Sequence, residues 1–193
     1  MALDSLEKLA GYFKTLPGVG YKTAMRYAYS ILNIDKNLVK EFAHSLIDVK
    51  ENIHFCSECG YYTEDETCSI CMRRKKDVVC VVKDPKDVMA FEKMGAFDGV
   101  YHCLHGTIDF QKNITVEDIR VKELVARLTD VKEVIIALDA DISGEMTSTY
   151  LANLIKPLGI KVSKIAHGIP MGSEIEYADE VTLQKALSER REM

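Results

Sequence analysis

The residues best suited to chemistry are four cysteines arranged as two C-x-x-C pairs. The pairs are Cys56-Ser57-Glu58-Cys59 and Cys68-Ser69-Ile70-Cys71, with eight residues between them. Zn²⁺ prefers four ligands in a tetrahedron, and thiolate is among its preferred ligands. Because sulfur atoms would fill all four positions, no place is left for a reactive water. The spacing therefore predicts one structural zinc site, made of Cys56, Cys59, Cys68 and Cys71.

The same pairs have two other interpretations, as disulfides or as redox-active dithiols. The first residues are acidic where a secretory signal peptide would be basic, and two more cysteines, Cys80 and Cys103, lie elsewhere. Both observations favour a reducing compartment, in which zinc is the commoner use of paired cysteines. We therefore expect a cytoplasmic protein with Zn²⁺ as its cofactor.

A second group of residues could bind anions at the turn Leu16-Pro17-Gly18-Val19-Gly20. Gly18 and Gly20 permit backbone conformations and close approaches that other residues resist. The first amides of the following helix would face outward, with Lys22 and Arg26 beside them on one helical face. This arrangement can bind phosphate without reading bases, and it resembles a helix-hairpin-helix DNA-binding motif. The alternative is an ordinary helical corner with two solvated cations.

Three acidic residues, Asp139, Asp141 and Glu145, follow a strongly apolar segment. Carboxylates two residues apart at the end of a parallel strand can bind Mg²⁺. The pattern resembles the acidic signature of a Toprim domain, the metal-binding fold of topoisomerases and primases. Those enzymes also need a glutamate after the first strand, where this chain has Lys83. A lysine there would repel Mg²⁺ and could pair with Asp139 or Asp141, so we expect no catalysis; a magnesium-dependent phosphoryl-transfer enzyme is the alternative.

The elements that must position these acids alternate between strands and helices. Apolar, β-branched runs such as Val78-Val79-Cys80-Val81-Val82 predict strands buried on both faces. We expect strands at 78–82, 99–104, 134–138 and 162–166, and helices at 87–94, 117–129 and 145–156. This alternation predicts a parallel sheet covered by helices, which is an α/β architecture. Before it, three apolar stripes of helical spacing predict three helices that share a small core.

Charge is distributed unevenly along the chain. The formal net charge is −5, which argues weakly against a nucleic-acid-binding protein. Residues 1–77 nevertheless hold equal numbers of basic and acidic residues, so a DNA-binding surface is expected there. The run Arg73-Arg74-Lys75-Lys76 either adds to that surface or is a solvated linker. The chain has no G-x-x-x-x-G-K-[ST] loop, which argues against an ATPase, and no apolar run long enough to cross a membrane.

In their order along the chain, these motifs resemble the RecR family of bacterial recombination mediators. The similarity begins at Leu16-Pro-Gly-Val-Gly and the four cysteines. It continues through Val82-Lys-Asp-Pro-Lys-Asp-Val, Tyr101-His-Cys-Leu-His-Gly, Gly168-Ile-Pro-Met-Gly, Tyr177-Ala-Asp-Glu-Val-Thr-Leu and Arg190-Arg-Glu. The resemblance therefore spans the chain from end to end.

The resemblance implies a mixed α/β chain of four segments. These are a helix-hairpin-helix region at 1–53, a four-cysteine zinc finger at 54–77, a Toprim domain at 78–173 and a C-terminal oligomerisation segment at 174–193. It further implies a nucleoid-associated homotetramer that forms a ring-like clamp on single- and double-stranded DNA. Its role would lie in recombinational DNA repair after DNA damage, without catalysis, where it acts with RecO, and in some settings RecF, to help load RecA on single strands.

The resemblance also assigns roles to residues. Lys22 and Arg26 match the family's DNA-contacting basic positions, and Glu145 matches an acidic position implicated in partner binding. Asp139-Ala140-Asp141 departs from the Asn-Pro-containing sequence common in the family, which leaves magnesium binding open. Two alternatives remain: a protein-interaction scaffold whose DNA contact is incidental, and a tail that packs on its own domain instead of a neighbouring subunit.

Overall fold

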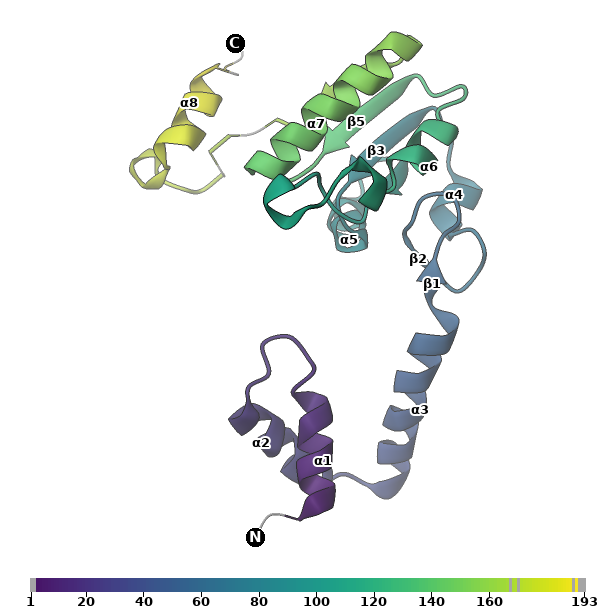
Figure 1. The fold of residues 1–193 in the computed structure, drawn as a ribbon, viewed down its shortest axis with the longest axis vertical. Helices are drawn as coiled ribbons and strands as arrows, with labels where there is room; N and C mark the ends of the chain where they lie inside the picture. The colour runs from purple at the N-terminus through teal and green to yellow at the C-terminus, as the bar shows by residue number, and fades with distance from the viewer. Residues whose placement is uncertain (1–2, 167, 170, 189, 191–193) are drawn as a thin grey trace. The chain divides into compact units, whose positions relative to one another are not determined.

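The computed structural model describes residues 3–166, 168–169, 171–188 and 190 (Figure 1). The predicted segments at 1–53, 78–173 and 174–193, and the motifs at 168–172 and 190–192, are therefore described only in part. The chain divides into two compact units, Met1–Ile53 and His54–Met193.

The first unit consists of helices α1 (Asp4–Phe13), α2 (Tyr21–Ile31) and α3 (Lys36–Asn52). α1 and α2 pack against each other through four buried side chains: Leu6, Ala10, Ala24 and Ala28. At the start of α3, the Asp35 carboxylate accepts a hydrogen bond from the amide of Asn37 at 2.8 Å and so caps the helix. All three predicted helices are present.

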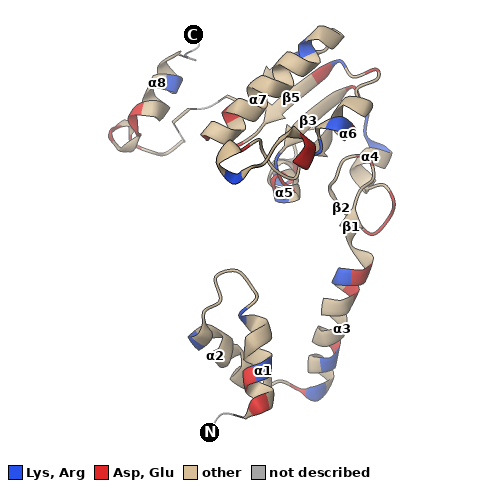
Figure 2. Cartoon of the chain, viewed as in Figure 1, with Lys and Arg blue, Asp and Glu red and all other residues tan. Residues whose placement is uncertain are grey.

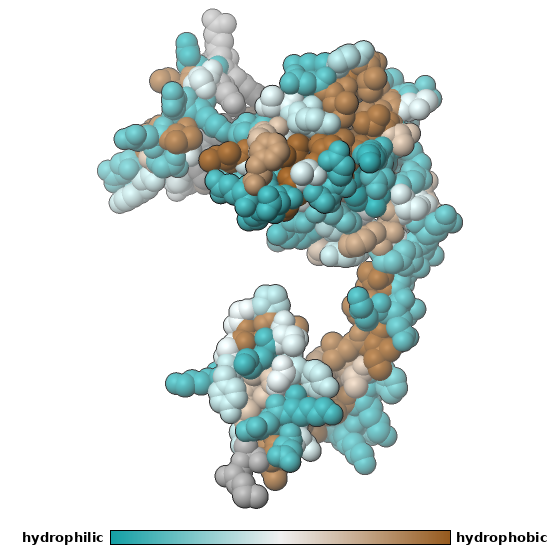
Figure 3. Space-filling model, viewed as in Figure 1, coloured by the Kyte–Doolittle hydropathy of each residue, from teal (hydrophilic) through white to brown (hydrophobic). Residues whose placement is uncertain are grey.

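The prediction that the three helices share one core is wrong for α3, none of whose residues is buried. Its apolar stripe is between 46% and 59% exposed at Leu38, Phe42, Leu46 and Val49, and apolar surface is visible along this helix in Figure 3. α1 and α2 fill their shared core with each other's side chains. α3 faces them across an open apolar pocket that Phe13, Tyr27 and Phe42 help to line, so its stripe stays exposed. The periodicity identified the helix but not its partner.

The second unit is built on a four-stranded parallel sheet in the order β4-β3-β5-β6. The strands are β3 (Val78–Val82), β4 (Val100–Cys103), β5 (Glu133–Ala137) and β6 (Lys161–Lys164). Each lies within two residues of its predicted range, so the parallel α/β architecture is confirmed. We call the residues from β3 to β6 the sheet domain.

Alternate residues of the strands point into separate cores on the two faces of the sheet. Val79 and Val81 join the larger core with α6 (Val121–Ala126) and α7 (Ile142–Ile155), while Cys80 and Val82 face α5 (Pro85–Met94). Figure 1 shows the helices around the sheet. This burial on both faces explains the continuous β-branched runs in the sequence.

Two helices differ by three residues or more from their predicted bounds. α6 is shorter, because Thr115 and Asp118 form a capping box on the 3-10 turn η2 (Val116–Asp118) and Ile119 then becomes extended. α7 begins three residues earlier than the predicted 145, with Asp141 as its N-cap. Glu145 therefore lies inside the first turn of α7.

The cysteine-rich segment lies between α3 and β3. It contains the antiparallel pair β1 (His54–Phe55) and β2 (Tyr62–Thr63), followed by α4 (Ser69–Arg73). The remaining described elements are η1 (Phe110–Lys112), η3 (Lys156–Leu158), η4 (Ile175–Tyr177) and α8 (Glu180–Ser188). In the part of the chain that the structure describes, no helix is long and apolar enough to span a membrane.

Candidate functional site

The four predicted metal ligands come together in one buried cluster. The sulfur atoms of Cys56, Cys59, Cys68 and Cys71 all lie within 4.8 Å of one another. The sulfurs of Cys59 and Cys68 are 3.6 Å apart, and a zinc tetrahedron with Zn–S bonds of about 2.3 Å separates its sulfurs by about 3.8 Å. All six cysteines lie in the described chain and are free. The cluster therefore fits zinc and not a pair of disulfides.

Backbone amides orient the sulfur atoms. Tyr61 N donates to Cys59 Sγ at 3.4 Å, and Cys68 N donates to Cys56 Sγ at 3.3 Å. Such bonds fix the direction of the ligand atoms and offset part of the thiolate charge. We call each C-x-x-C pair a knuckle: the first holds Cys56 and Cys59, and the second holds Cys68 and Cys71. The Arg127 guanidinium, 3.8 Å from Cys71 Sγ, adds a positive charge beside the second knuckle. Four thiolates around one Zn²⁺ leave an excess of negative charge, which these donors partly neutralise.

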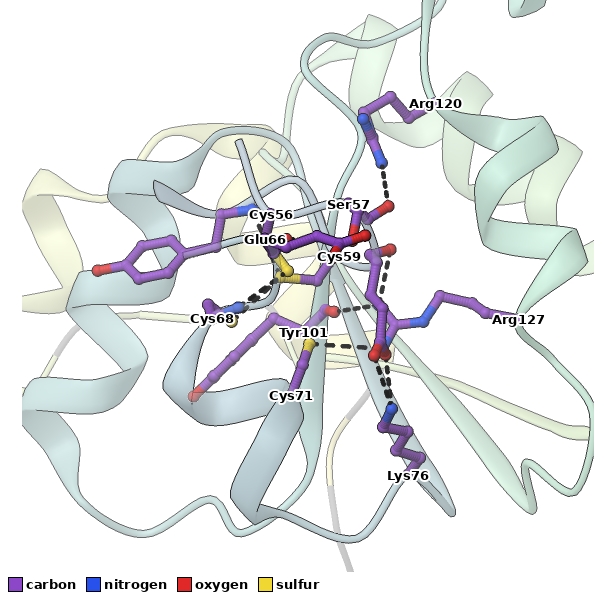
Figure 4. A network of polar contacts seen from close by, with 12 residues as sticks. Cys56, Ser57, Cys59, Glu66, Cys68, Cys71, Lys76, Tyr101, Arg120 and Arg127 are labelled. Atoms are coloured by element: carbon purple, nitrogen blue, oxygen red, sulfur yellow. Dashed lines mark hydrogen bonds and ion pairs between the residues drawn. The ribbon is translucent and has the colours of Figure 1, made fainter. Parts of the chain in front are cut away.

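The first knuckle is fastened to the sheet domain by its own backbone (Figure 4). Four consecutive carbonyl oxygens, those of residues 57–60, accept hydrogen bonds from groups of the sheet domain. The pairs are Ser57 O with Arg120 Nη2 at 3.5 Å, Glu58 O with Arg127 Nη1 at 3.4 Å, Cys59 O with Cys103 N at 2.7 Å and Gly60 O with His105 Nε2 at 2.7 Å. We call this set the carbonyl ladder.

Gly60 allows the carbonyl ladder to form. Its φ of +75° lies in the left-handed region, and a Cβ there would meet Arg120 Nε and His105 Nε2 at 3.0 Å. The sequence shows a glycine directly after Cys59 but not the contacts that require it. Backbone carbonyls occur in every residue, so no signal in the sequence marks the ladder.

The basic run at 73–76 is partly consumed by internal contacts. Arg74 binds both carboxylate oxygens of Glu92 at 2.7 and 2.8 Å and also donates to the carbonyl of Phe97. Lys76 binds the Glu58 carboxylate at 2.6 Å. The two parallel hydrogen bonds of such a bidentate Arg–carboxylate pair hold Arg74 in one geometry. The Arg74–Glu92 pair links the cysteine-rich segment to α5 of the sheet domain, and both cations are engaged by carboxylates and not free for phosphate.

Lys83 pairs with the first of the predicted acids. Its Nζ lies 2.9 Å from Asp139 Oδ2, which confirms one of the two predicted pairings and raises the pKa of Lys83. Asp141 instead accepts hydrogen bonds from Gly144 N at 2.7 Å and from Ser143 Oγ at 2.8 Å. The backbone bond, ahead of the Ser143 bond, lowers the pKa of Asp141. The Asp141 side chain thus caps the N-terminus of α7.

Two lysines engage the third acid. Glu145 binds Lys164 Nζ at 2.6 Å and Lys185 Nζ of α8 at 2.5 Å. Lys164 first and Lys185 second lower the pKa of Glu145 to about 2. Sequence reasoning missed both lysines, which are distant in the chain and belong to no motif. Among the described residues, the cysteine cluster is the only group of three or more His, Cys, Asp or Glu side chains close enough for one metal ion.

Gly144 is required by the close approach of α7 to the end of β5. A Cβ at this position would lie 2.1 Å from the carbonyl oxygen of Asp139. The glycine therefore fixes the loop that carries Asp139 and Asp141. The sequence shows the glycine, but only the structure shows the backbone that it approaches.

The predicted phosphate-binding turn connects α1 and α2. Gly18 has a φ of +77°, so it uses the left-handed freedom of glycine. Gly20 has a φ of −79° and is the N-cap of α2, with no neighbouring atom within 4 Å of a Cβ built there. Lys22 and Arg26 are exposed on α2, and neither forms an ion pair within the described residues. Figure 2 shows basic residues on α2 and no acidic ones.

Comparison with protein families gives four matches in this order. The RecR helix-hairpin-helix model matches residues 6–50, and the RecR four-cysteine zinc finger domain model matches 53–72. The Toprim domain model matches 77–166, and the RecR C-terminal model matches 168–191. The molecule is thus a Toprim-domain protein with a helix-hairpin-helix region and one structural zinc site.

Three of these matches are to models specific to one family, and they lie on both sides of the Toprim domain. The chain belongs to the RecR family. Its domains support a role in DNA recombination and repair, and its helix-hairpin-helix and Toprim domains suggest DNA binding. When bound, zinc joins the two knuckles and contributes to folding; the four cysteines would hold it.

Proposed function

We propose that this protein is a recombination mediator without catalytic activity, which binds the DNA backbone and acts with RecO, and in some settings RecF, to help load RecA on single strands. The observation that carries the proposal is the exposed pair of cations on α2, unpaired within the described residues, directly after the turn at Gly18. The proposed roles of RecO, RecF and RecA are inferred from membership of the RecR family.

Phosphate binding at this turn follows from its local geometry. The first amides of α2 have no partner within the helix, and the helix dipole favours an anion beside them. Gly20 has no side chain to occupy that space. Lys22 and Arg26 then add two charges along the same face of α2, so binding depends on phosphate and not on base sequence.

Assembly into a ring of four subunits is supported by apolar surface that the single chain leaves exposed. The stripe on α3 is one such surface. In the C-terminal segment, Val181 is 64% exposed and Leu187 is 68% exposed. A neighbouring copy that covers both regions would stabilise each subunit and repeat Lys22 and Arg26 around one opening, where their fields add.

The absence of catalysis is supported by the state of the Toprim acids. Lys83 occupies the position of the usual glutamate and binds Asp139, while the Asp141 carboxylate caps α7. A magnesium ion would have to displace both arrangements. We assign Glu145, whose side chain is 38% exposed, to the surface that binds a partner protein.

The test is DNA binding by the full chain over a salt series, with and without Mg²⁺. The variant Lys22→Ala/Arg26→Ala should lose salt-sensitive binding by about tenfold or more, because two phosphate contacts disappear. Lys36→Ala/Lys40→Ala is the matched control, since it removes two exposed cations four residues apart on α3. Intact DNA throughout supports a binding protein. Magnesium-dependent cleavage of the DNA that Asp139→Asn abolishes would show instead that the protein is an enzyme.

Mediator activity is measured separately, as RecA assembly on single strands coated with single-strand-binding protein in the presence of RecO. We expect Glu145→Ala to weaken recruitment by RecO while DNA binding is retained. Lys22→Ala/Arg26→Ala should show the reverse pattern. Loading that survives the loss of Lys22 and Arg26 would favour a protein scaffold whose contact with DNA is incidental.

A further inference from the structure

Two tyrosines on α2, Tyr21 and Tyr29, have exposed side chains that do not belong to the core of the first unit. The side chain of Tyr21 is 57% exposed and that of Tyr29 is 51% exposed. Within the described residues, neither hydroxyl has a hydrogen-bond partner and neither ring has an aromatic neighbour. Tyr27, by contrast, packs edge-on against Phe13 at 5.7 Å and lies beneath the Arg26 guanidinium. Tyr27 is structural, whereas Tyr21 and Tyr29 are available to a ligand.

These two rings lie among the cations that bind phosphate. Lys22, Arg26 and Tyr29 follow one another at spacings of four and three residues, which places them in one stripe along α2. Tyr21 is the first residue of the helix, beside the turn at Gly20. The sequence has no acidic residue between Glu7 and Asp35. Two aromatic rings therefore flank two positive charges along α2, and this part of the sequence has no carboxylate to repel phosphate.

A single strand of nucleic acid matches this surface better than a duplex does. Cations and amides bind phosphates of either form, but only a single strand presents the flat faces of its bases to aromatic side chains. The rise of an α-helix separates Tyr21 from Tyr29 by about 12 Å along the axis of α2. Two rings at that distance can contact different bases of one strand while Lys22 and Arg26 bind the phosphates between them.

We propose that Tyr21 and Tyr29 are base-stacking residues that give the hairpin of this chain a preference for single-stranded DNA. The proposal rests on the proposed function, because it uses the same phosphate-binding face. It adds a ligand class, the unpaired base, to a site otherwise assigned to the backbone alone. Stacking does not distinguish one base from another, so binding remains independent of sequence.

The experiment uses the full chain and three fluorescent probes of equal length: a mixed-sequence single strand, an abasic single strand and a duplex. Wild type should bind the ordinary strand more tightly than the abasic one. Tyr21→Ala/Tyr29→Ala should weaken binding to the ordinary strand by about tenfold for each ring and leave the other two probes unchanged. Tyr21→Phe/Tyr29→Phe should restore binding, because stacking needs the ring and not the hydroxyl.

Tyr12→Ala is the matched control, since Tyr12 is 63% exposed but belongs to α1 and not to the stripe on α2. Circular dichroism and sedimentation of each variant report folding and assembly. Three results overturn the proposal: equal binding of ordinary and abasic strands by wild type, failure of the phenylalanine variant to restore binding, or a changed oligomeric state in the alanine variant. Failure of the proposed function is distinct, because Lys22→Ala/Arg26→Ala would then leave binding of all three probes unchanged.

Discussion

The two units of the chain differ in how much of their apolar surface they bury. Among the described residues, the first unit holds α1 and α2 together with a core of only four side chains, two on each helix, and leaves α3 exposed. The second unit has a continuous core of fifteen buried residues on one face of its sheet, a second core on the other face and a cluster of four buried cysteines. Stability is concentrated in the second unit, and the proposed DNA-binding face lies on the first.

This difference indicates a division of work. A small core is marginal by itself, so the first unit gains most from the contacts that assembly or DNA would add. The second unit supplies a rigid frame whose acids, cations and carbonyls are already engaged with one another.

Loss of the metal should damage the second unit most. We expect Cys71→Ser to abolish zinc binding and to lower the free energy of unfolding by several kcal/mol, because metal binding and local folding form one equilibrium. Zinc content and thermal unfolding measure the effect. Cys80→Ser is the control, since Cys80 is also buried but lies outside the cluster. A zinc-free Cys71→Ser protein that melts like wild type would contradict the structural role.

Two Gly→Ala substitutions should have opposite signs in the two units. Gly144→Ala places a Cβ 2.1 Å from the carbonyl of Asp139, and we expect destabilisation by about 3 kcal/mol as α7 is displaced. Gly11 lies exposed in the last turn of α1 with no atom within 4 Å of such a Cβ. Gly11→Ala should therefore stabilise α1 by about 0.5–1 kcal/mol. Chemical denaturation measures both; the same sign in both would refute the close approach at Gly144.

Truncation of a core side chain in the first unit should destabilise that unit and not the second. Leu6 is 6% exposed, and Leu6→Ala should remove about 2 kcal/mol of stability. Hydrogen exchange should then be faster in α1 and α2 and unchanged in β3 and β5. Leu3→Ala is the control, because Leu3 is 68% exposed. Faster exchange in the sheet as well would show that the two units unfold together.

Acid should weaken the second unit through His102. This histidine is fully buried, and its Nε2 donates to the carbonyl of Arg120 at 2.7 Å, while its Nδ1 has no partner among the described residues. Burial, and then the nearby charges of Arg127, Arg120 and His105, lower the pKa of His102 to about 3. A proton added at Nδ1 would have no acceptor.

The sign of the effect follows from linkage. The unfolded chain protonates His102 at its ordinary pKa near 6.5, and the folded chain does so only at a pKa of about 3. The contribution of His102 to the free energy of unfolding is therefore constant above about pH 6.5. It falls by up to about 1.4 kcal/mol per pH unit between about pH 6.5 and 3. In His102→Gln this contribution should vanish, whereas His44→Gln, at an exposed site, should keep the wild-type slope. Equal slopes in all three proteins would refute it.

Much of the second unit could be predicted from the sequence, because its signals are local. Runs such as Val78–Val82 reveal strands buried on both faces, and the spacing of the cysteines reveals the metal ligands. The position of a cation at a strand end predicted that Lys83 would pair with Asp139 or Asp141, and the structure shows Asp139 as its partner. Each of these inferences depends on residue type at a fixed spacing.

The rest depends on contacts between distant parts of the chain. The exposed stripe of α3 has the same periodicity as a buried one, so the sequence does not show whether a partner exists. Lys164 and Lys185 approach Glu145 only because the fold brings β6 and α8 to α7. Gly144 resembles any helix-start glycine until the carbonyl of Asp139 is seen beside it.

The carbonyl ladder has a consequence for exchanging parts between relatives. On the side of the first knuckle it uses only main-chain oxygen, so residues 57 and 58 can change type without losing the contact. The side chains that the ladder itself requires are Arg120, Arg127 and His105, together with the space left by Gly60. A zinc finger grafted from another member of the family should therefore attach to this sheet domain if it keeps that glycine. The same graft on a sheet domain without the two arginines and the histidine should lack these hydrogen bonds and remain unattached.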